Sequence, residues 1–286
     1  MKFRTIFALF NTVILLSFLF VFFLPFFLLG AEYSLTFWKD NWYLAAFFIA
    51  VLAVLNTFFL ANWKVFILVE NEDWNALSTH LVERIFAKKR YGNREVGLLV
   101  NAYLLQNDST GIERLEAELG ARRPELLRKN AVLFGVTYLL RNRPAEAESF
   151  LAPYLDAKDA RSREWLRFDY AFSLVLQRRA ADALVYLREG AASKDAVLSL
   201  LSAYLLGSIG VATIPGGFDS PEALELRSLT GSVRERLSKR FPAGKWEREI
   251  ERAKNEVHIV ILSKLIDDAS RWLRENGPDA ALGKKA

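Results

Sequence analysis

Two long apolar runs near the N-terminus constrain the fold of this chain more than any other feature. The first, Ile6 to Leu29, contains no charged residue. At a rise of ~1.5 Å per residue, a helix of this length crosses a hydrocarbon layer of ~30 Å. The second run, Tyr43 to Asn62, is flanked by Trp42 and Trp63. Tryptophan prefers the level of the lipid headgroups, so these rings mark the ends of a second span.

The connection between the runs, Gly30 to Trp42, is short, which predicts an antiparallel transmembrane hairpin over residues 1–63 with spans at about 6–29 and 43–62. A cleaved signal peptide is the alternative, but the first run exceeds the usual ~7–15-residue signal core and favours an anchor. Asn11 and Asn56 lie at similar depth. Either they hydrogen-bond across the hairpin, or each meets water at the membrane edge.

The distribution of basic residues predicts an orientation. Lys2 and Arg4 precede the first span and Lys64 follows the second, whereas Lys39 alone lies in the connection. The positive-inside rule then places both termini in the cytoplasm, by a margin of one or two charges. A short, simple topology of this kind suits a bacterial inner membrane. The reverse orientation would place the rest of the chain in the periplasm.

The chain after Trp63 has apolar residues at helical rather than strand spacing, which predicts an all-α fold. Short polar turns separate the segments of helical periodicity, and they predict antiparallel helix pairs stacked side by side. The expected helices are Asp73–Lys88, Arg94–Gln106, Gly111–Leu119, Pro124–Arg141, Ala145–Leu155, Arg163–Gln177, Ala180–Glu189 and Asp195–Leu206.

The C-terminal third is predicted to contain a helical pair over 221–276. Gly and Pro residues make 208–220 a loop. Ser220 and Pro221 suit the N-cap and first turn of a helix that ends near Arg240. A last helix is expected from Gly244 to Asn276, followed by a flexible tail, 277–286. Its apolar stripe either caps the repeats or pairs with another copy of the chain as a homo-oligomer.

Two helix pairs resemble tetratricopeptide (TPR) repeats. The positions that match the family's small and large residues, 36 residues apart, are Gly135, Tyr138, Ala147 and Leu151, then Ala171, Leu174, Ala183 and Leu187. Small residues there allow paired helices to approach closely. The family's early Trp and closing Pro are missing. The resemblance implies a TPR-like α-solenoid over 64–207, in which Val65–Val69 supplies a first helix before Asp73.

In TPR proteins the first helix of each repeat lines a concave groove that binds partner proteins. The resemblance places a partner-binding groove at Val132, Val136, Leu139, Trp165, Phe168, Phe172 and Val175, beginning beside Lys129. These residues are mostly apolar, which favours occupation by an amphipathic helix of a partner or by the chain's own C-terminal helices. The alternative is a shift of one turn, which would make them ordinary core.

No catalytic, cofactor-binding or metal-binding pattern is found, so we expect a protein that is not an enzyme. Cysteine is absent, and the two histidines are His80 and His258. His80 and Glu83 share a helix face, but two such groups do not make a metal site. No Walker loop, dinucleotide-binding glycine motif or nucleophile elbow is present.

The net charge of +5 is too small and too dispersed to predict nucleic-acid binding. One basic cluster, Arg84, Lys88, Lys89 and Arg90, follows the hairpin closely and is predicted to contact anionic lipid headgroups. The function expected is therefore a membrane-anchored scaffold or adaptor that recruits other proteins through a TPR-like domain. The alternative is a structural subunit of a bacterial envelope machine for secretion, pilus or flagellar assembly.

Overall fold

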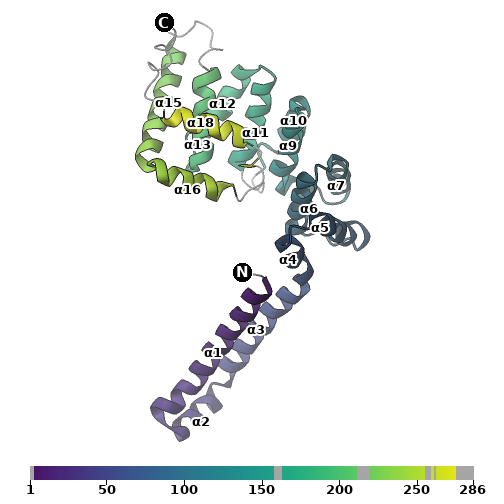
Figure 1. Cartoon of the computed structure of the whole chain (residues 1–286), viewed down its shortest axis with the longest axis vertical. Coiled ribbons are helices and arrows are strands. Elements are labelled where there is room, and N and C mark those ends of the chain that lie inside the picture. The colour runs from purple at the N-terminus through teal and green to yellow at the C-terminus, as the bar shows by residue number, and fades with distance from the viewer. Residues whose placement is uncertain (1–2, 158–162, 211–219, 255–258, 261, 275–286) are drawn as a thin grey trace. The chain divides into compact units, whose positions relative to one another are not determined.

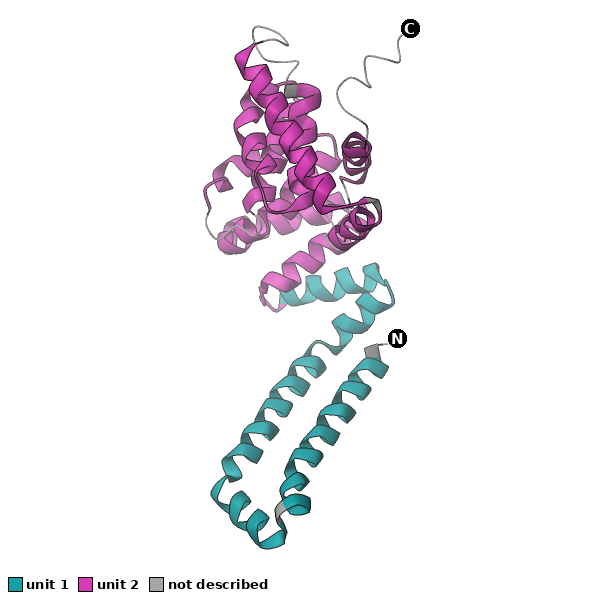
Figure 2. Cartoon of the chain, turned by 90° about the vertical axis from the view of Figure 1, so that its left-hand side faces the viewer, with its two compact units in different colours: residues 1–87 teal, residues 88–286 magenta. Residues whose placement is uncertain are grey.

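The computed structural model describes residues 3–157, 163–210, 220–254, 259–260 and 262–274. The elements within these residues are helices, without a strand, which confirms the all-α class (Figure 1). The chain divides into two compact units, residues 1–87 and 88–286 (Figure 2). Each is described by itself below.

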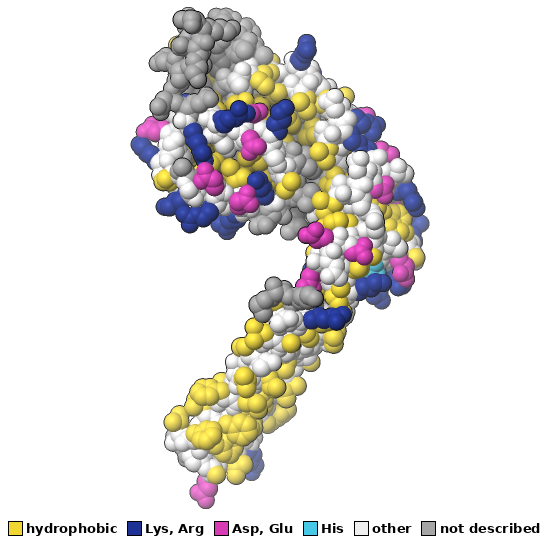
Figure 3. Space-filling model, in the orientation of Figure 1, with side chains coloured by type: hydrophobic (Ala, Val, Ile, Leu, Met, Phe, Trp, Pro, Cys, Tyr) yellow, Lys and Arg dark blue, Asp and Glu magenta, His cyan; other side chains and the backbone are white. Residues whose placement is uncertain are grey.

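The first unit begins with the two apolar runs. Its elements are α1 (Phe3–Leu29), α2 (Ala31–Asp40), α3 (Trp42–Ala61), α4 (Trp63–Glu70), α5 (Trp74–Val82) and the π-helical turn η1 (Glu83–Ala87). Two of them, α1 and α3, are long and apolar enough to cross a membrane. Their surface is almost entirely hydrophobic, whereas charged side chains gather on the second unit (Figure 3).

Aromatic rings fill the seam of the antiparallel hairpin. The rings of Phe7 and Phe59 lie 5.6 Å apart, centroid to centroid. Eleven residues further along α1, the ring of Phe18 stacks on that of Phe48 at 4.6 Å. Such pairs contribute ~0.5–1.5 kcal/mol each beyond the area they bury.

The two asparagine amides do not hydrogen-bond across this seam. The side-chain N–H of Asn11 donates to the carbonyl of Phe7, and that of Asn56 donates to the carbonyl of Leu52, each at 3.0 Å. Of the two alternatives for these amides, the interhelical hydrogen bond is therefore not formed. Bonding to the carbonyl one turn back satisfies each amide within its own helix.

The first compact unit extends beyond the predicted hairpin, 1–63, to residue 87. Asn62 alone separates α3 from α4, and α4 packs against α5, so the compact unit ends after Ala87. As expected, the apolar segment Val65–Val69 forms a helix paired with the one that begins at Trp74. The second long helix thus leads directly into a helix pair.

The second unit continues with helix pairs. Its elements are α6 (Asn93–Leu105), α7 (Ser109–Arg122), α8 (Pro124–Lys129), α9 (Ala131–Leu140), α10 (Pro144–Leu151), η2 (Ala152–Tyr154), α11 (Arg163–Leu176), α12 (Ala180–Ala191), α13 (Ala196–Leu205), η3 (Leu206–Gly210), α15 (Pro221–Arg240), α16 (Ala243–Ala253) and α18 (Ser263–Arg274). Helix α11 packs against α9, α10, α12 and α13, and α9 also packs against α6 and α10.

Four helix–helix turns have the same geometry. One residue in each has positive φ, between 53° and 61°, and the N–H of the next residue donates to the carbonyl five residues back, which is a Schellman-type helix end. These residues are Glu72, Asn107, Asn142 and Arg178, at intervals of 35 or 36 residues. The chain therefore repeats one helix–turn–helix unit, including the pair α4–α5.

Close packing occurs at the small residues predicted for it. A Cβ added to Gly135 would lie 2.9 Å from Cγ of Leu151, inside van der Waals contact. Ala147, Ala171 and Ala183 are fully buried. These contacts join α9 to α10 and α11 to α12.

Two predicted helices are interrupted. Pro124–Arg141 breaks at Asn130, which is buried and whose amide donates to the Asn93 side chain at 2.8 Å. Within the described residues, the helix predicted from Gly244 to Asn276 is divided between α16 and α18. They run antiparallel, because Trp246 near the start of α16 donates to Ser270 near the end of α18.

The C-terminal helices share one hydrophobic core with the repeats. Ile266 and Leu273 of α18 are buried in the same cluster as Leu200 of α13, and α18 packs against α13 and α15. In the single chain, the C-terminal helices therefore cap the end of the repeats. At the start of α15 the hydroxyl of Ser220 accepts from the Ala223 N–H at 3.2 Å, which confirms the predicted N-cap. Most of the predicted loop 208–220, the tail 277–286 and His258 lie outside the described residues.

Candidate functional site

The predicted groove residues lie inside the protein. Val132, Val136, Leu139, Trp165 and Phe168 are buried, whereas Phe172 and Val175 are half-buried against the same core. The prediction of an open groove at these positions is therefore wrong, and the residues pack in the core. The physical reason is that α9 and α11 each have helices on several sides, so only a narrow strip of each helix reaches solvent.

Trp165 shows the structural role of this set. Its indole N–H donates to the Asp195 carboxylate at 3.0 Å, and the same carboxylate caps α13 by accepting from the N–H groups of Val197 and Leu198. The ring is 5% exposed. Trp165 thus fixes the start of α13 against α11.

The solvent-facing strip ends instead in three exposed leucines. Leu105, Leu140 and Leu176 are the last residues of α6, α9 and α11, and they are 54%, 49% and 42% exposed. Each precedes the positive-φ residue of its turn by two positions. Because α6 packs against α9 and α9 against α11, the three side chains stand at one edge of the stacked pairs. We call this set the leucine row.

Polar side chains beside the leucine row are already paired across neighbouring helix pairs. The Glu113 carboxylate accepts from Arg141 at 2.7 Å, and the Glu148 carboxylate accepts from Arg179 at 2.8 Å and from Gln177 at 2.8 Å. These groups come from equivalent positions of successive repeats. They fix one pair against the next and leave the leucines as the apolar feature of that edge.

A half-buried tyrosine–carboxylate pair joins α9 to α7. The Tyr138 hydroxyl donates to the Glu116 carboxylate at 2.8 Å. Burial raises the pKa of Glu116, although the Tyr138 hydrogen bond opposes this, and burial with the same hydrogen bond raises the pKa of Tyr138. The tyrosine therefore stays protonated and acts as a donor.

One buried carboxyl was not anticipated from the sequence. Asp169 in α11 is 0% exposed, and neither of its carboxylate oxygens has a hydrogen-bond partner. Burial raises the pKa of Asp169 well above its usual range. Nothing in its sequence neighbourhood distinguishes Asp169 from a solvated helical aspartate.

The predicted headgroup cluster is divided between the two units. Arg84 is half-buried in η1 of the first unit, whereas Lys88, Lys89 and Arg90 are exposed at the start of the second. Lys89 is paired with Glu118 at 3.1 Å. Glu118 also accepts from the Tyr91 hydroxyl, and this hydrogen bond raises the pKa of Tyr91.

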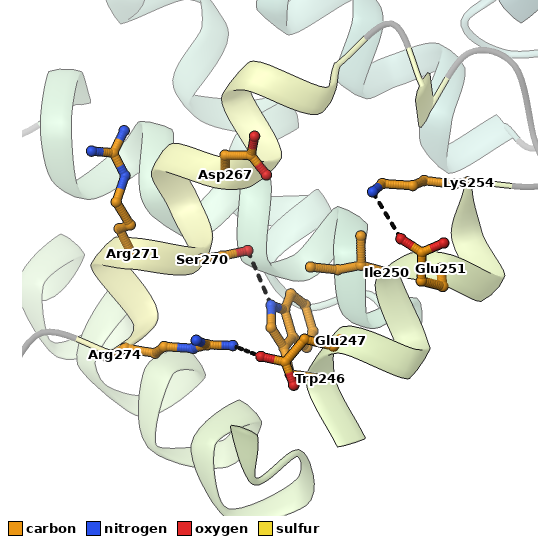
Figure 4. A pocket seen from close by; sticks show the side chains of 9 residues that line it. All are labelled: Trp246, Glu247, Ile250, Glu251, Lys254, Asp267, Ser270, Arg271 and Arg274. Carbon is orange, nitrogen blue, oxygen red and sulfur yellow. Dashed lines mark hydrogen bonds and ion pairs between the residues drawn. The ribbon is translucent and has the colours of Figure 1, made fainter. Parts of the chain in front are cut away.

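A cleft of about 340 Å³ lies between α16 and α18 (Figure 4). Four of its charged side chains form ion pairs, Arg274 with Glu247 and Lys254 with Glu251 at 2.9 Å, and Arg271 pairs with Asp268. Elsewhere in the described residues no group of three or more His, Asp or Glu side chains is placed to hold a metal ion. Because most charged side chains of the cleft are already paired, the leucine row is the stronger candidate for a binding surface.

Comparison with known proteins shows where the chain belongs. A protein of Treponema pallidum (strain Nichols), described as "Uncharacterized protein", is 28% identical over 229 residues, which is 79% of this chain and 73% of the other. No solved structure matches. A family model described as "Uncharacterised Treponema protein" matches residues 111–275. Because this match covers more than half of the chain and most of its helical second unit, the chain belongs to that Treponema family.

Proposed function

We propose that this protein is a non-enzymatic adaptor, held in a membrane by its N-terminal hairpin, which recruits another protein through a TPR-like helical domain. The observation that carries the proposal is the leucine row. Large apolar side chains recur at one edge of three successive helix pairs while the neighbouring charges are paired with each other. Repeated apolar exposure is typical of a binding surface.

The geometry of the row suits an amphipathic helix. Neighbouring packed helices lie ~8–10 Å apart, so leucines on α6, α9 and α11 recur at about that interval. Every seventh residue of a helix recurs at ~10.5 Å on one face. A partner helix crossing the row would therefore present one apolar residue to each leucine.

The membrane assignment rests on α1 and α3, which have the length and hydropathy of spans. Lys2 and Arg4 near the start of the first span and Lys64 just after the second favour both termini in the cytoplasm, and the short, simple topology suits a bacterial inner membrane. In that orientation Lys88, Lys89 and Arg90 would strengthen attachment to anionic lipid. Reporter enzymes fused after Ala286 test the orientation. A reporter that is active only in the cytoplasm should give activity, and one that is active only in the periplasm should give none.

Site-specific photo-crosslinking in intact membranes tests the adaptor role. A photoreactive residue at Leu140 should form an adduct with a different protein, and Leu105→Asp with Leu176→Asp should abolish that adduct. Val185 on α12 is 62% exposed and lies outside the row, so it is the matched control position. Equal adducts at both positions, or adducts of this chain with itself alone, would count against recruitment through the row. Surface substitutions of this kind change stability by only ~0.5 kcal/mol, so the fold should survive.

A further inference from the structure

The first unit carries an unequal pair of spans. The apolar part of α1 is 25 residues long, Arg4–Leu28, and that of α3 is 20, Trp42–Ala61. Phe18 stacks on Phe48, and six residues toward the tip this register brings Leu24 level with Trp42, the first residue of α3. The excess length of α1, from Pro25 onward, therefore extends beyond α3.

Helix α2 folds back along this excess. The Trp38 ring stacks on the Phe22 ring at 4.6 Å, and its indole N–H donates to the Phe22 carbonyl at 3.2 Å. Ser34 of α2 is fully buried, and its hydroxyl donates to the Gly30 carbonyl. The connection between the spans is therefore a packed helix, not an open loop.

The two faces of α2 differ in chemistry. Ser34, Phe37 and Trp38 are covered or half-covered, on the side that packs against α1. Glu32, Thr36, Lys39 and Asp40 are exposed on the opposite side. Charged side chains are excluded from hydrocarbon, so α2 cannot lie at the depth of the lipid tails.

The apolar tip is equally unsuited to water. Phe27 is 85% exposed and Leu28 71%, and on α2 Tyr33 is 56% and Leu35 64% exposed. A polar helix face joined to an apolar tip matches the boundary between headgroups and acyl chains. The tip also continues, without a break, the exposed apolar surface of α1.

The backbone near Phe22 supports the same depth. Pro25 has no N–H to donate to the Val21 carbonyl, and the next carbonyl, of Phe22, receives the Trp38 indole. The Val21 carbonyl therefore loses its usual donor, which is costly in hydrocarbon but is compensated where water reaches it. Trp38, Trp42 and Tyr43 lie near this level, where aromatic residues are enriched at a membrane interface.

We propose that the hydrocarbon boundary on the side away from the termini lies at the level of Phe22 and Trp38, and that α2 with the last turn of α1 is an interfacial cap bound among lipid headgroups. From Arg4 to Phe22, α1 then spans ~27 Å, close to the thickness of a hydrocarbon layer. This proposal rests on the membrane insertion proposed above. It adds a second contact with lipid that the two spans alone do not make.

Depth measurements on spin-labelled protein test the proposal. Because the chain has no cysteine, single cysteines can be introduced in the full-length protein at Leu16, Leu28, Leu35 and Thr36. The protein is reconstituted in vesicles of phosphatidylethanolamine and phosphatidylglycerol. Collision of the label with oxygen, which concentrates in hydrocarbon, is compared with collision with a water-soluble nickel chelate.

The expected pattern has three levels. Leu16 should be accessible to oxygen only. Leu35 and Thr36, within three residues of Trp38, should give intermediate values of the headgroup layer, and Leu28, ~9 Å beyond Phe22, should be the most accessible of the four to the nickel chelate. If Leu28 were as deep as Leu16, or if Leu35 and Thr36 were as accessible to nickel as Leu28, the boundary would be misplaced and the proposal overturned while insertion stood. Nickel access at Leu16 would instead overturn insertion itself, and the cap with it.

A pair of substitutions tests the packing of α2. Trp38→Ala removes both the ring stack and the hydrogen bond to α1, so it should mobilise a label at Leu35 and raise its nickel collision rate severalfold. Trp42→Ala is the control, since Trp42 is 67% exposed on α3. Equal effects of the two substitutions would contradict an α2 that is held by Trp38.

Discussion

The contact between Gly135 and Leu151 allows a prediction in which the sign of a mutational effect reverses. Gly135 lies inside α9, where replacing glycine by alanine ordinarily stabilises a helix by ~1 kcal/mol. Here the new Cβ would lie 2.9 Å from Cγ and 3.1 Å from Cδ1 of Leu151, and closer still to Cδ2. Leu151 is fully buried in the core and has little room to move.

The two effects of Gly135→Ala oppose each other. Overpacking a filled core costs ~1–3 kcal/mol, which exceeds the gain in helix propensity. We therefore expect Gly135→Ala to lower the free energy of unfolding by up to ~2 kcal/mol. Leu151→Ala alone should cost ~2–5 kcal/mol through the cavity it leaves. In the Leu151→Ala background the clash is gone, so Gly135→Ala should stabilise by up to ~1 kcal/mol.

Urea unfolding of the full-length protein in detergent measures these values. Fluorescence of the buried Trp165 and Trp246 reports the second unit. Gly231 in α15 is the matched control, because a Cβ there meets no atom within 4 Å, and Gly231→Ala should simply stabilise. If Gly135→Ala had the same sign and size in both backgrounds, close helix approach at Gly135 would not be the reason for the glycine.

Burial of Asp169 and Trp165 and the two long apolar helices allow three further predictions. Asp169→Asn should raise the free energy of unfolding at neutral pH. Because the pKa of Asp169 is raised, the parent loses stability as pH rises from about 4 toward the folded-state pKa. The stability gained by Asp169→Asn should therefore shrink below pH ~4, and a gain that does not depend on pH would contradict this. Trp165→Ala should destabilise the fold by ~3–5 kcal/mol in urea unfolding, whereas a variant that melts like the parent would restore Trp165 as a surface residue. Full-length protein should stay in the membrane pellet after alkaline carbonate extraction; its release would argue against two spans.

The sequence alone determined the features that depend on local chemistry. Helical periodicity, Gly and Pro at turns, and the Ser220 cap depend on neighbours within one or two turns, so the helix ranges were predictable to within a few residues over most of the chain. The small residues Gly135, Ala147, Ala171 and Ala183 also revealed where helices approach closely. The length and hydropathy of the two long N-terminal helices were predictable because they are properties of composition.

Only the tertiary structure decided which helix face is covered. Trp165 and Phe168 have the same apolar character as the exposed Leu176, and only the packing of α11 against its neighbours separates core from surface. The break at Asn130 depends on Asn93, 37 residues away, and the return of α2 depends on the reach of Trp38 to Phe22. Burial and long-range hydrogen bonds depend on residues brought together by folding, and a pattern of spacing along one helix carries no record of them.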